Sequence, residues 1–294
     1  WSLVTLGYLA PLAVTLLALA TWNAAERAQW WPFLLIALLV VFSLDTTAVI
    51  CVISVTCALL MRELKLRGGS WRRTLAAIAV LVIALAAYLY VGRVFLYPNV
   101  APAPDTAGFS TLLDIGWARL TNMVLAIAAL SIADRQAGFT MLFTDPDLSH
   151  RILGVLVIVA HVWFWWRALR DQWNQTLFLA VCIMLFCYGA AAGIVLGRVP
   201  IFGPDYVFQQ RYLMLYQLGT VAITLMAAGS NWREWSAVQR LLVSAALLCL
   251  IAMQYPLSRA TWKEAPYVQA YGNNLGRQMM LLGIDPTVRL ASCA

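Results

Sequence analysis

The residues best suited to chemistry in this sequence lie in one polar segment, residues 197–212, between two long apolar runs. The segment contains two arginines, one aspartate, four aromatic residues and four glycines or prolines. A guanidinium group can bind a phosphate through two parallel hydrogen bonds. We therefore expect Arg198 and Arg211 to bind the phosphate of a lipid carrier.

Arg93 is a third candidate for phosphate binding, because it also lies within a few residues of an expected membrane boundary. Ionisable groups are costly inside a membrane, so those that occur there often mark a functional site. The alternative for each arginine is that its long side chain extends to lipid headgroups without specific binding. The occurrence of two arginines on one segment favours the binding site.

Carboxylates supply the candidate acid–base groups. Asp205 lies in the same polar segment, Asp105 follows three prolines, and Asp45 interrupts an apolar run. A carboxylate can act as a general base toward a hydroxyl, or hold a divalent cation that bridges phosphates. The alternative for Asp45 is a turn or helix-capping role. The chain has two histidines and no nucleotide-binding glycine loop, HExxH, CxxC or GxSxG motif, so the sequence identifies neither a catalytic residue nor a metal site.

The composition places these residues in a membrane protein. Hydrophobic residues make up 63% of the 294 residues and charged residues only 11%, which excludes a soluble domain with a charged surface. The net charge of +7 is typical of basic loops beside anionic headgroups, so we expect membrane lipids and no nucleic acid as partners. The six cysteines form no CxxC pair, which predicts core packing. The sequence thus predicts an all-α, polytopic transmembrane bundle.

The apolar runs predict about eight membrane helices, each of about 20 residues. The expected helices cover residues 2–20, 75–91, 152–166, 174–196, 213–228 and 239–254, with 21–32 as a tryptophan-containing loop. The run 33–61 would span about 43 Å as a single helix, so two short helices that meet at Asp45 fit it better. We expect residues 1–254 to form the transmembrane domain and residues 255–294 a short extracytoplasmic tail.

Charged loops predict which helix ends face the cytoplasm. Residues 62–73 carry five basic residues and one acid, and the positive-inside rule places them in the cytoplasm. Residues 167–173 are expected on the same side, which places residues 197–212 outside. Residues 110–133 are cleanly apolar only in their second half, so they predict an interfacial helix that leads into a short or re-entrant one. The alternative is a full crossing, which would invert the remaining loops.

Small residues recur at a spacing of four in one expected helix, at Gly189, Gly193 and Gly197. This spacing forms a smooth face on which another helix can pack closely. One interpretation is packing within the chain, and the other is a helix–helix contact with a partner protein.

Short motifs distributed over most of the chain allow comparison with known membrane families. They are Leu196-Gly197-Arg198, Phe202-Gly203 and Arg211-Tyr212 before an apolar helix, Phe42-Ser43 in a broken apolar run, Tyr88 and Tyr90 before a proline-rich loop, and a tail with Ala270-Tyr271, Leu275 and Gly283-Ile284-Asp285-Pro286. This pattern resembles the late part of large bacterial membrane glycosyltransferases of the GT-C type.

The resemblance implies a multi-pass protein of the bacterial inner membrane that uses a polyprenyl-phosphate-linked sugar on its outer face in cell-envelope glycan assembly. In such a protein Arg198, Arg211 and Arg93 would bind the carrier phosphate. Tyr206 and Tyr212 would stack on the sugar or the isoprenoid chain. The resemblance also implies a catalytic carboxylate in the first outer loop, which is expected N-terminal to this chain. The chain would then be a C-terminal portion, with its catalytic residue unknown.

Two other functions fit the sequence. The first is a non-catalytic accessory or structural subunit of a larger membrane complex, favoured by the lack of a catalytic motif, the small-residue helix and thirteen tryptophans. The second is a polysaccharide polymerase or transporter, which predicts ionisable residues at the midplane and paired halves of the chain. Only Asp45 meets the first condition, and no second half is recognisable.

Overall fold

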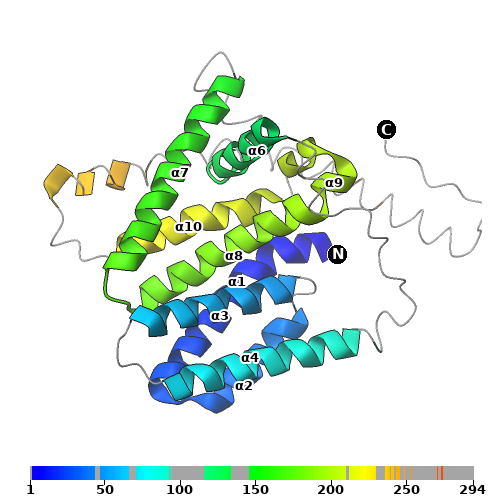
Figure 1. The fold of residues 1–294 in the computed structure, drawn as a ribbon, viewed down its shortest axis with the longest axis vertical. Coiled ribbons are helices and arrows are strands. Elements are labelled where there is room, and N and C mark those ends of the chain that lie inside the picture. Colours follow the sequence, from blue (N-terminus) through cyan, green and yellow to red (C-terminus); the bar gives the residue numbers. More distant parts are fainter. Residues whose placement is uncertain are drawn as a thin grey trace, which may run out of the picture.

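A computed structural model describes residues 2–43, 47–65, 71–92, 94, 116–133, 146–209 and 212–229, together with isolated positions beyond residue 229 (Figure 1). Every regular element in these ranges is helical. The elements are α1 (Ser2–Arg27), α2 (Trp30–Ser43), α3 (Thr47–Lys65), α4 (Trp71–Val91), α6 (Trp117–Leu130), α7 (Pro146–Arg170), α8 (Gln175–Gly197), α9 (Val199–Phe202), the 3-10 helix η2 (Pro204–Phe208) and α10 (Leu213–Gly229).

The described helices confirm the predicted class, an all-helical protein with several helices suited to cross a membrane. Five stretches of the described chain are long and apolar enough to do so: Leu9–Arg27, Thr47–Lys65, Trp71–Val91, His150–Arg170 and Gln175–Phe202. Helices α2, α6 and α10 are apolar but shorter. Eight spans are therefore not established. The expected helix 239–254 and the tail 255–294 lie outside the described residues, apart from isolated positions.

Helix α1 is longer than predicted, because residues 21–27 continue the helix and do not form a loop. Thr21 keeps its hydroxyl satisfied inside the helix by donating to the carbonyl of Leu17, at 2.6 Å. Ala24 packs into the core without exposed surface, so this turn gains burial as well as helical hydrogen bonds. The helix ends just before Ala28, which adopts a positive φ of 55° that a continuing helix cannot accommodate.

The predicted break in the run 33–61 is confirmed, since α2 ends at Ser43 and α3 begins at Thr47. The hydroxyl of Ser43 donates to the carbonyl of Val40 at 2.9 Å. Such a local bond competes with the regular backbone pattern and is common where helices end. Asp45, the residue on which the break was predicted, lies outside the described residues.

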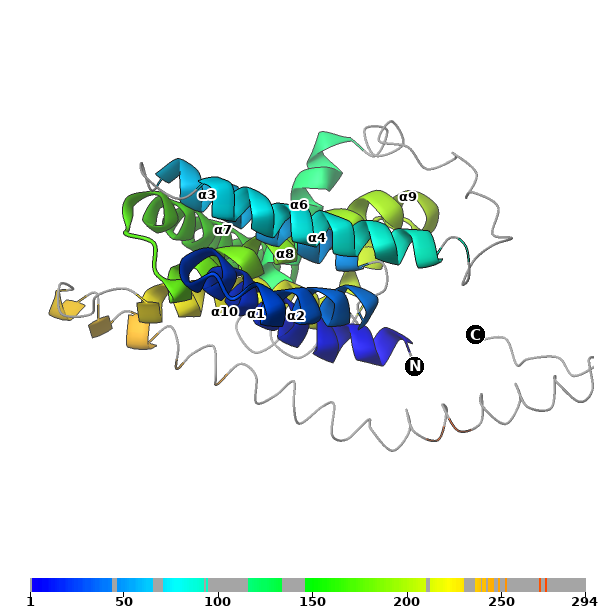
Figure 2. The same ribbon diagram turned by 90° about the horizontal axis from the view of Figure 1, so that it is seen from below.

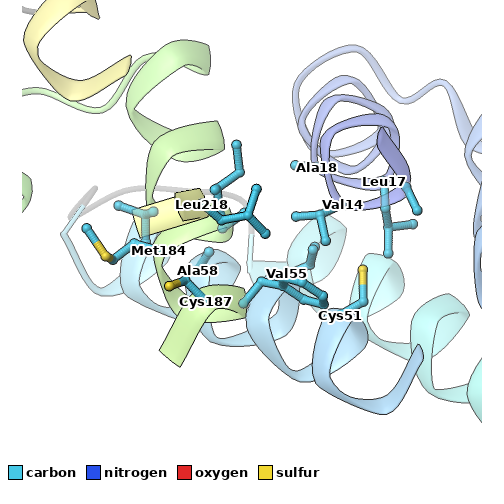
Figure 3. Close-up of a cluster of buried hydrophobic side chains, with 14 of the residues drawn as sticks. Val14, Leu17, Ala18, Cys51, Val55, Ala58, Met184, Cys187 and Leu218 are labelled. Carbon is cyan, nitrogen blue, oxygen red and sulfur yellow. The ribbon is translucent and has the colours of Figure 1, made fainter. Parts of the chain in front are cut away.

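The core lies where α1, α3, α8 and α10 meet (Figure 3). Leu17 of α1, Val55 of α3, Met184 of α8 and Leu218 of α10 converge there, and all four are buried. Helix α8 is apolar on all sides, as expected of a helix surrounded by others. The buried cysteines Cys51, Cys182 and Cys187 carry free thiols in or beside this core.

Helices α4 and α7 lie at the periphery. Their outward faces carry large apolar side chains, including Ile83 at 64% exposure on α4 and Val162 at 65% on α7. Such faces are unfavourable in water but need no protein partner in a lipid bilayer, whose acyl chains are as apolar as these side chains. The distribution supports a multi-pass membrane protein. Figure 1 shows α7 passing one end of α10, and α8 and α10 run side by side.

The connections expected in the cytoplasm meet at one end of the bundle. Lys65, at the end of α3, donates to the carbonyl oxygens of Ala168, at 3.2 Å, and of Asp171. Arg62 forms an ion pair with Glu26, at the end of α1. We call this the basic end, and its described basic residues are Arg27, Arg62, Lys65, Arg72, Arg73, Arg167 and Arg170. It is the end that the positive-inside rule predicts to face the cytoplasm.

Helix α6 enters the bundle from the opposite end, where α8 ends and α10 begins. Its 14 residues reach about 21 Å, which is less than the hydrocarbon thickness of about 30 Å. At its C-terminus, the backbone carbonyl of Ser131 accepts a hydrogen bond from Thr220 at 3.0 Å. Thr220 lies about 10 Å along α10 from its first residue, Leu213. Within the described residues 116–133, helix α6 thus ends beside the middle of α10, and whether segment 110–133 crosses the membrane stays a prediction.

Candidate functional site

The polar segment 197–212 is more ordered than the loop predicted from its glycines and prolines. It folds into the single-turn helix α9 and the 3-10 helix η2. Pro200 and Pro204 lie in the first turns of these helices, where a missing backbone N–H costs nothing. Gly203 joins the two helices with a φ of 88°, a conformation that favours glycine. The turn-forming residues were recognised correctly, but they start short helices here.

Helices α9 and η2 are held against α6 by a small apolar cluster. The cluster consists of the buried residues Met123 and Ala126 from α6, Val199 from α9 and Val207 from η2. The hydroxyl of Tyr216, on α10, donates to the carbonyl of Val207 at 3.2 Å and fixes the 3-10 turn. In Figure 1 and Figure 2, α6 lies beside α9 at this end of the molecule.

A pocket of about 400 Å³ lies between α6 and η2. Its lining residues are Arg119, Asn122, Met123, Pro204, Asp205 and Phe208. Ligand pockets in proteins fall within about 300–1,000 Å³ and combine apolar walls with a few polar groups. This pocket falls within that size range, and three of its six lining residues are polar or charged.

Helical spacing brings the α6 side of the pocket together. Arg119, Asn122 and Met123 are three and four residues apart, so they project from one face of the helix. On the other side, the short turn of η2 presents Asp205 and Phe208 to the same space. The ring of Phe208 also lies 5.7 Å from that of His150, at the start of α7, which supports the wall from behind.

The three polar groups of the pocket are available to a ligand. Within the part of the chain that the structure describes, no ion pair or side-chain hydrogen bond engages Arg119, Asn122 or Asp205. Together they offer a cation, an amide that both donates and accepts, and an anion. The arrangement can therefore recognise hydroxyl, carbonyl or charged groups by hydrogen bonding.

Aromatic rings gather beside the pocket. Phe202 stacks on Tyr206 with ring centroids 4.6 Å apart and an interplanar angle of 14°. Tyr206 in turn meets Tyr212 at 5.8 Å. The structure thus brings together the two tyrosines singled out in the sequence and adds Phe202 to them. Ile201 and Phe202 of α9 remain more than half exposed, as does Trp117 of α6.

Arg198 lies at the junction of α8 and α9, where its backbone N–H caps α8 by donating to Ile194. Its side chain is exposed and does not line the pocket. The other predicted site residues, Arg93, Arg211, Asp45 and Asp105, lie outside the described residues. Of the carboxylates proposed to act as an acid or to hold a metal, only Asp205 is therefore placed. Among the described residues no cluster of histidine, cysteine, aspartate and glutamate could bind a metal ion.

Sequence reasoning did not single out Arg119 and Asn122 as site residues. Both belong to the segment 110–133, which the sequence showed to be cleanly apolar only in its second half. A usable signal was present, since two polar residues three apart on a short apolar helix mark one face of that helix. What the sequence could not show is that η2, more than 80 residues later, faces them.

The small-residue face of α8 packs against α3 within the chain. A Cβ atom added at Gly189 would lie 2.5 Å from Cγ2 of Ile50, and one at Gly193 would lie 3.5 Å from Cδ1 of the same side chain. A Cβ at Gly197 would meet no atom within 4 Å. The expected contact with a partner helix could therefore use this face only near Gly197.

A second polar group is the half-buried His161 of α7. Its Nδ1 is 3.1 Å from the hydroxyl of Tyr188, which also accepts a hydrogen bond from Nε1 of Trp165 at 3.1 Å. On the other side, its Nε2 faces Gly219 of α10. The histidine therefore packs between α7, α8 and α10 and does not line the pocket between α6 and η2.

Comparisons with models of protein families, with curated proteins and with solved structures give no match. Fold and site together define a multi-pass helical membrane protein with a polar pocket at the end of the bundle opposite the basic end.

Proposed function

We propose that this protein acts in cell-envelope glycan assembly in the bacterial inner membrane, as a GT-C-like glycosyltransferase that takes a sugar from a polyprenyl-phosphate carrier. One observation carries the proposal: the pocket between α6 and η2 places a cation, an amide and a carboxylate beside exposed apolar helices. A lipid-linked sugar has the same division into a polar head and an apolar tail. The positive-inside rule assigns the pocket to the extracytoplasmic side.

The surroundings of the pocket support the binding of an amphiphile. Trp117 is 76% exposed and Ile201 is 62% exposed, and they lie two residues before Arg119 and three residues before Pro204, which line the pocket. Tryptophan is enriched at the interface between membrane and water, where its ring contacts lipid and its N–H stays hydrated. These side chains would contact the first isoprenoid units while the sugar enters the pocket. The stacked rings of Phe202 and Tyr206 lie within the same region.

The phosphate of the carrier is assigned to Arg198, together with Arg211 and Arg93. Arg198 ends α8 at the edge of the apolar bundle, is exposed and is free to form a bidentate pair. Among the described carboxylates, Asp205 is the one that lines the pocket, and it could accept the proton of an acceptor hydroxyl. A divalent cation, if used, would require further ligands from other parts of the chain.

The test is a binding measurement on the full chain in lipid nanodiscs, with decaprenyl phosphate as the probe and native mass spectrometry as the readout. Arg198→Ala should weaken retention of decaprenyl phosphate by about 10-fold or more, because a charge-assisted hydrogen bond is worth about 1.5–3 kcal/mol. Arg72→Ala is the matched control, since Arg72 is exposed on α4 and lies at the basic end, opposite the polar segment.

Phosphatidylglycerol serves as the comparison lipid, because snorkelling to headgroups would affect it equally. Equal loss of both lipids in Arg198→Ala, or no loss of either, would remove the carrier-phosphate role.

The alternative of an accessory subunit has less support. It relied on a small-residue face for a partner helix, and α3 already covers that face at Gly189 and Gly193. A polymerase or transporter remains the second alternative, without an observation among the described residues that favours it over the transferase.

A further inference from the structure

The charges of the pocket between α6 and η2 balance. Arg119 is the one basic residue among its six lining residues, and Asp205 is the one acid. The two groups form no ion pair with each other, since the described residues contain ion pairs only elsewhere in the chain. Each is therefore presented separately to whatever enters the pocket.

This balance disfavours a phosphate or diphosphate as the occupant. An anion that reached Arg119 would also face the carboxylate of Asp205, and like charges at short range oppose binding. Sites for phosphate groups usually combine several positively charged side chains or backbone N–H groups, without a nearby carboxylate. The predicted phosphate ligand Arg198 lies outside this lining.

The same three groups suit a ring that carries several hydroxyls. The carboxylate of Asp205 accepts hydrogen bonds from neighbouring hydroxyls, the guanidinium of Arg119 donates to their oxygens, and the amide of Asn122 does both. Phe208 adds an aromatic face, which is a large apolar surface for the C–H side of such a ring.

We propose that this pocket is a binding site for a neutral sugar ring, whereas phosphate binds outside it. The inference rests on the proposed function, and it divides the head of the carrier between two places: the sugar lies between α6 and η2, and the phosphate lies toward Arg198. The sugar could belong to a lipid-linked donor or to a growing glycan, and the two sources share this chemistry.

Saturation-transfer NMR on the full chain in nanodiscs tests the proposal, with methyl α-glucopyranoside, methyl α-mannopyranoside and methyl α-galactopyranoside as neutral probes and inorganic pyrophosphate as the anionic competitor. At least one glycoside should receive saturation, and pyrophosphate should not displace it. Asp205→Asn and Arg119→Gln should each weaken glycoside binding about tenfold or more, as expected for a lost charge-assisted hydrogen bond. Both side chains are exposed, so these variants should keep the melting temperature of the parent protein.

Arg72→Gln, at the basic end, is the matched control for the loss of one exposed guanidinium, and it should bind the glycoside as the parent does. Failure of all three glycosides to bind, displacement by pyrophosphate, or stronger binding in Asp205→Asn would overturn the proposal.

Competition with decaprenyl-phosphate-linked mannose distinguishes the two sources. If the lipid-linked mannose displaces the glycoside at a much lower concentration than free sugar does, the sugar belongs to a lipid-linked donor. If both displace it at the same concentration, the sugar belongs to a glycan chain. If the glycoside binds as expected but Arg198→Ala retains decaprenyl phosphate, the sugar site stands and the carrier role of Arg198 fails. The opposite result would remove the sugar site and leave the carrier role intact.

Discussion

Gly154 of α7 lies where α6 crosses this helix, and we expect Gly154→Ala to push the two helices apart. A Cβ at this position would lie 2.4 Å from the backbone oxygen of Leu125 and 3.0 Å from its carbonyl carbon. Real Cβ atoms do not approach backbone atoms so closely, and a backbone carbonyl cannot move aside as a side chain can. Helix α6 must therefore shift as a whole.

The expected cost is about 1–3 kcal/mol of unfolding free energy, the range observed when an extra carbon is forced into a packed interior. The shift should also disturb the pocket, because α6 carries Arg119 and Asn122. Gly154→Ala should consequently weaken glycoside binding, although residue 154 does not line the pocket.

Gly193→Ala is the matched control, since its Cβ would lie at an ordinary 3.5 Å from Ile50. There the gain in helix propensity, of up to about 1 kcal/mol, should make the substitution neutral or stabilising. Both variants can be compared by thermal unfolding in the same detergent. If Gly154→Ala proves as stable as Gly193→Ala, the close crossing of α6 and α7 is refuted.

Two further predictions concern contacts between helices. Gly189→Ala should destabilise the protein by about 1 kcal/mol, because its Cβ would contact Cγ2 of Ile50. Adding Ile50→Ala should offset part of that cost. If the double variant loses as much unfolding free energy as the two single variants together, the contact is contradicted. Thr220→Val should lower the unfolding free energy by about 0.5–1.5 kcal/mol, because it removes the hydrogen bond from α10 to Ser131. Thr224→Val should lower it less, because Thr224 bonds within its own helix. Equal losses of stability in thermal unfolding would argue against a link between α10 and α6.

Much of the fold could be predicted because its signals are local. Long apolar runs bounded by charge identified α8 and α10, and the polar interruption near residue 45 identified the break between α2 and α3. The two basic loops were predicted to share one side from their charge alone, and the bonds of Lys65 to the loop after α7 support this. Charge bias and helix length each depend on a single stretch of sequence.

The remaining features depend on contacts between distant parts of the chain. The tryptophan and polar residues of segment 21–27 predicted an interfacial loop. The segment is helical instead, because the helix buries Ala24 in the core. The prolines of segment 197–212 fit a turn and the start of a short helix equally well, and packing on α6 selects the helix. The pocket itself exists only because α6 and η2 meet.

The central claim is that the pocket between α6 and η2 receives the sugar end of a polyprenyl-phosphate-linked donor. The most direct measurement is photo-crosslinking in membranes with a decaprenyl-phosphate mannose analogue that carries a diazirine on the sugar, followed by peptide mapping. We expect the label on residues 117–130 and 199–209, and we expect Asp205→Asn to reduce it. Label spread evenly over the lipid-facing helices α4 and α7, or concentrated at the basic end, would contradict the claim.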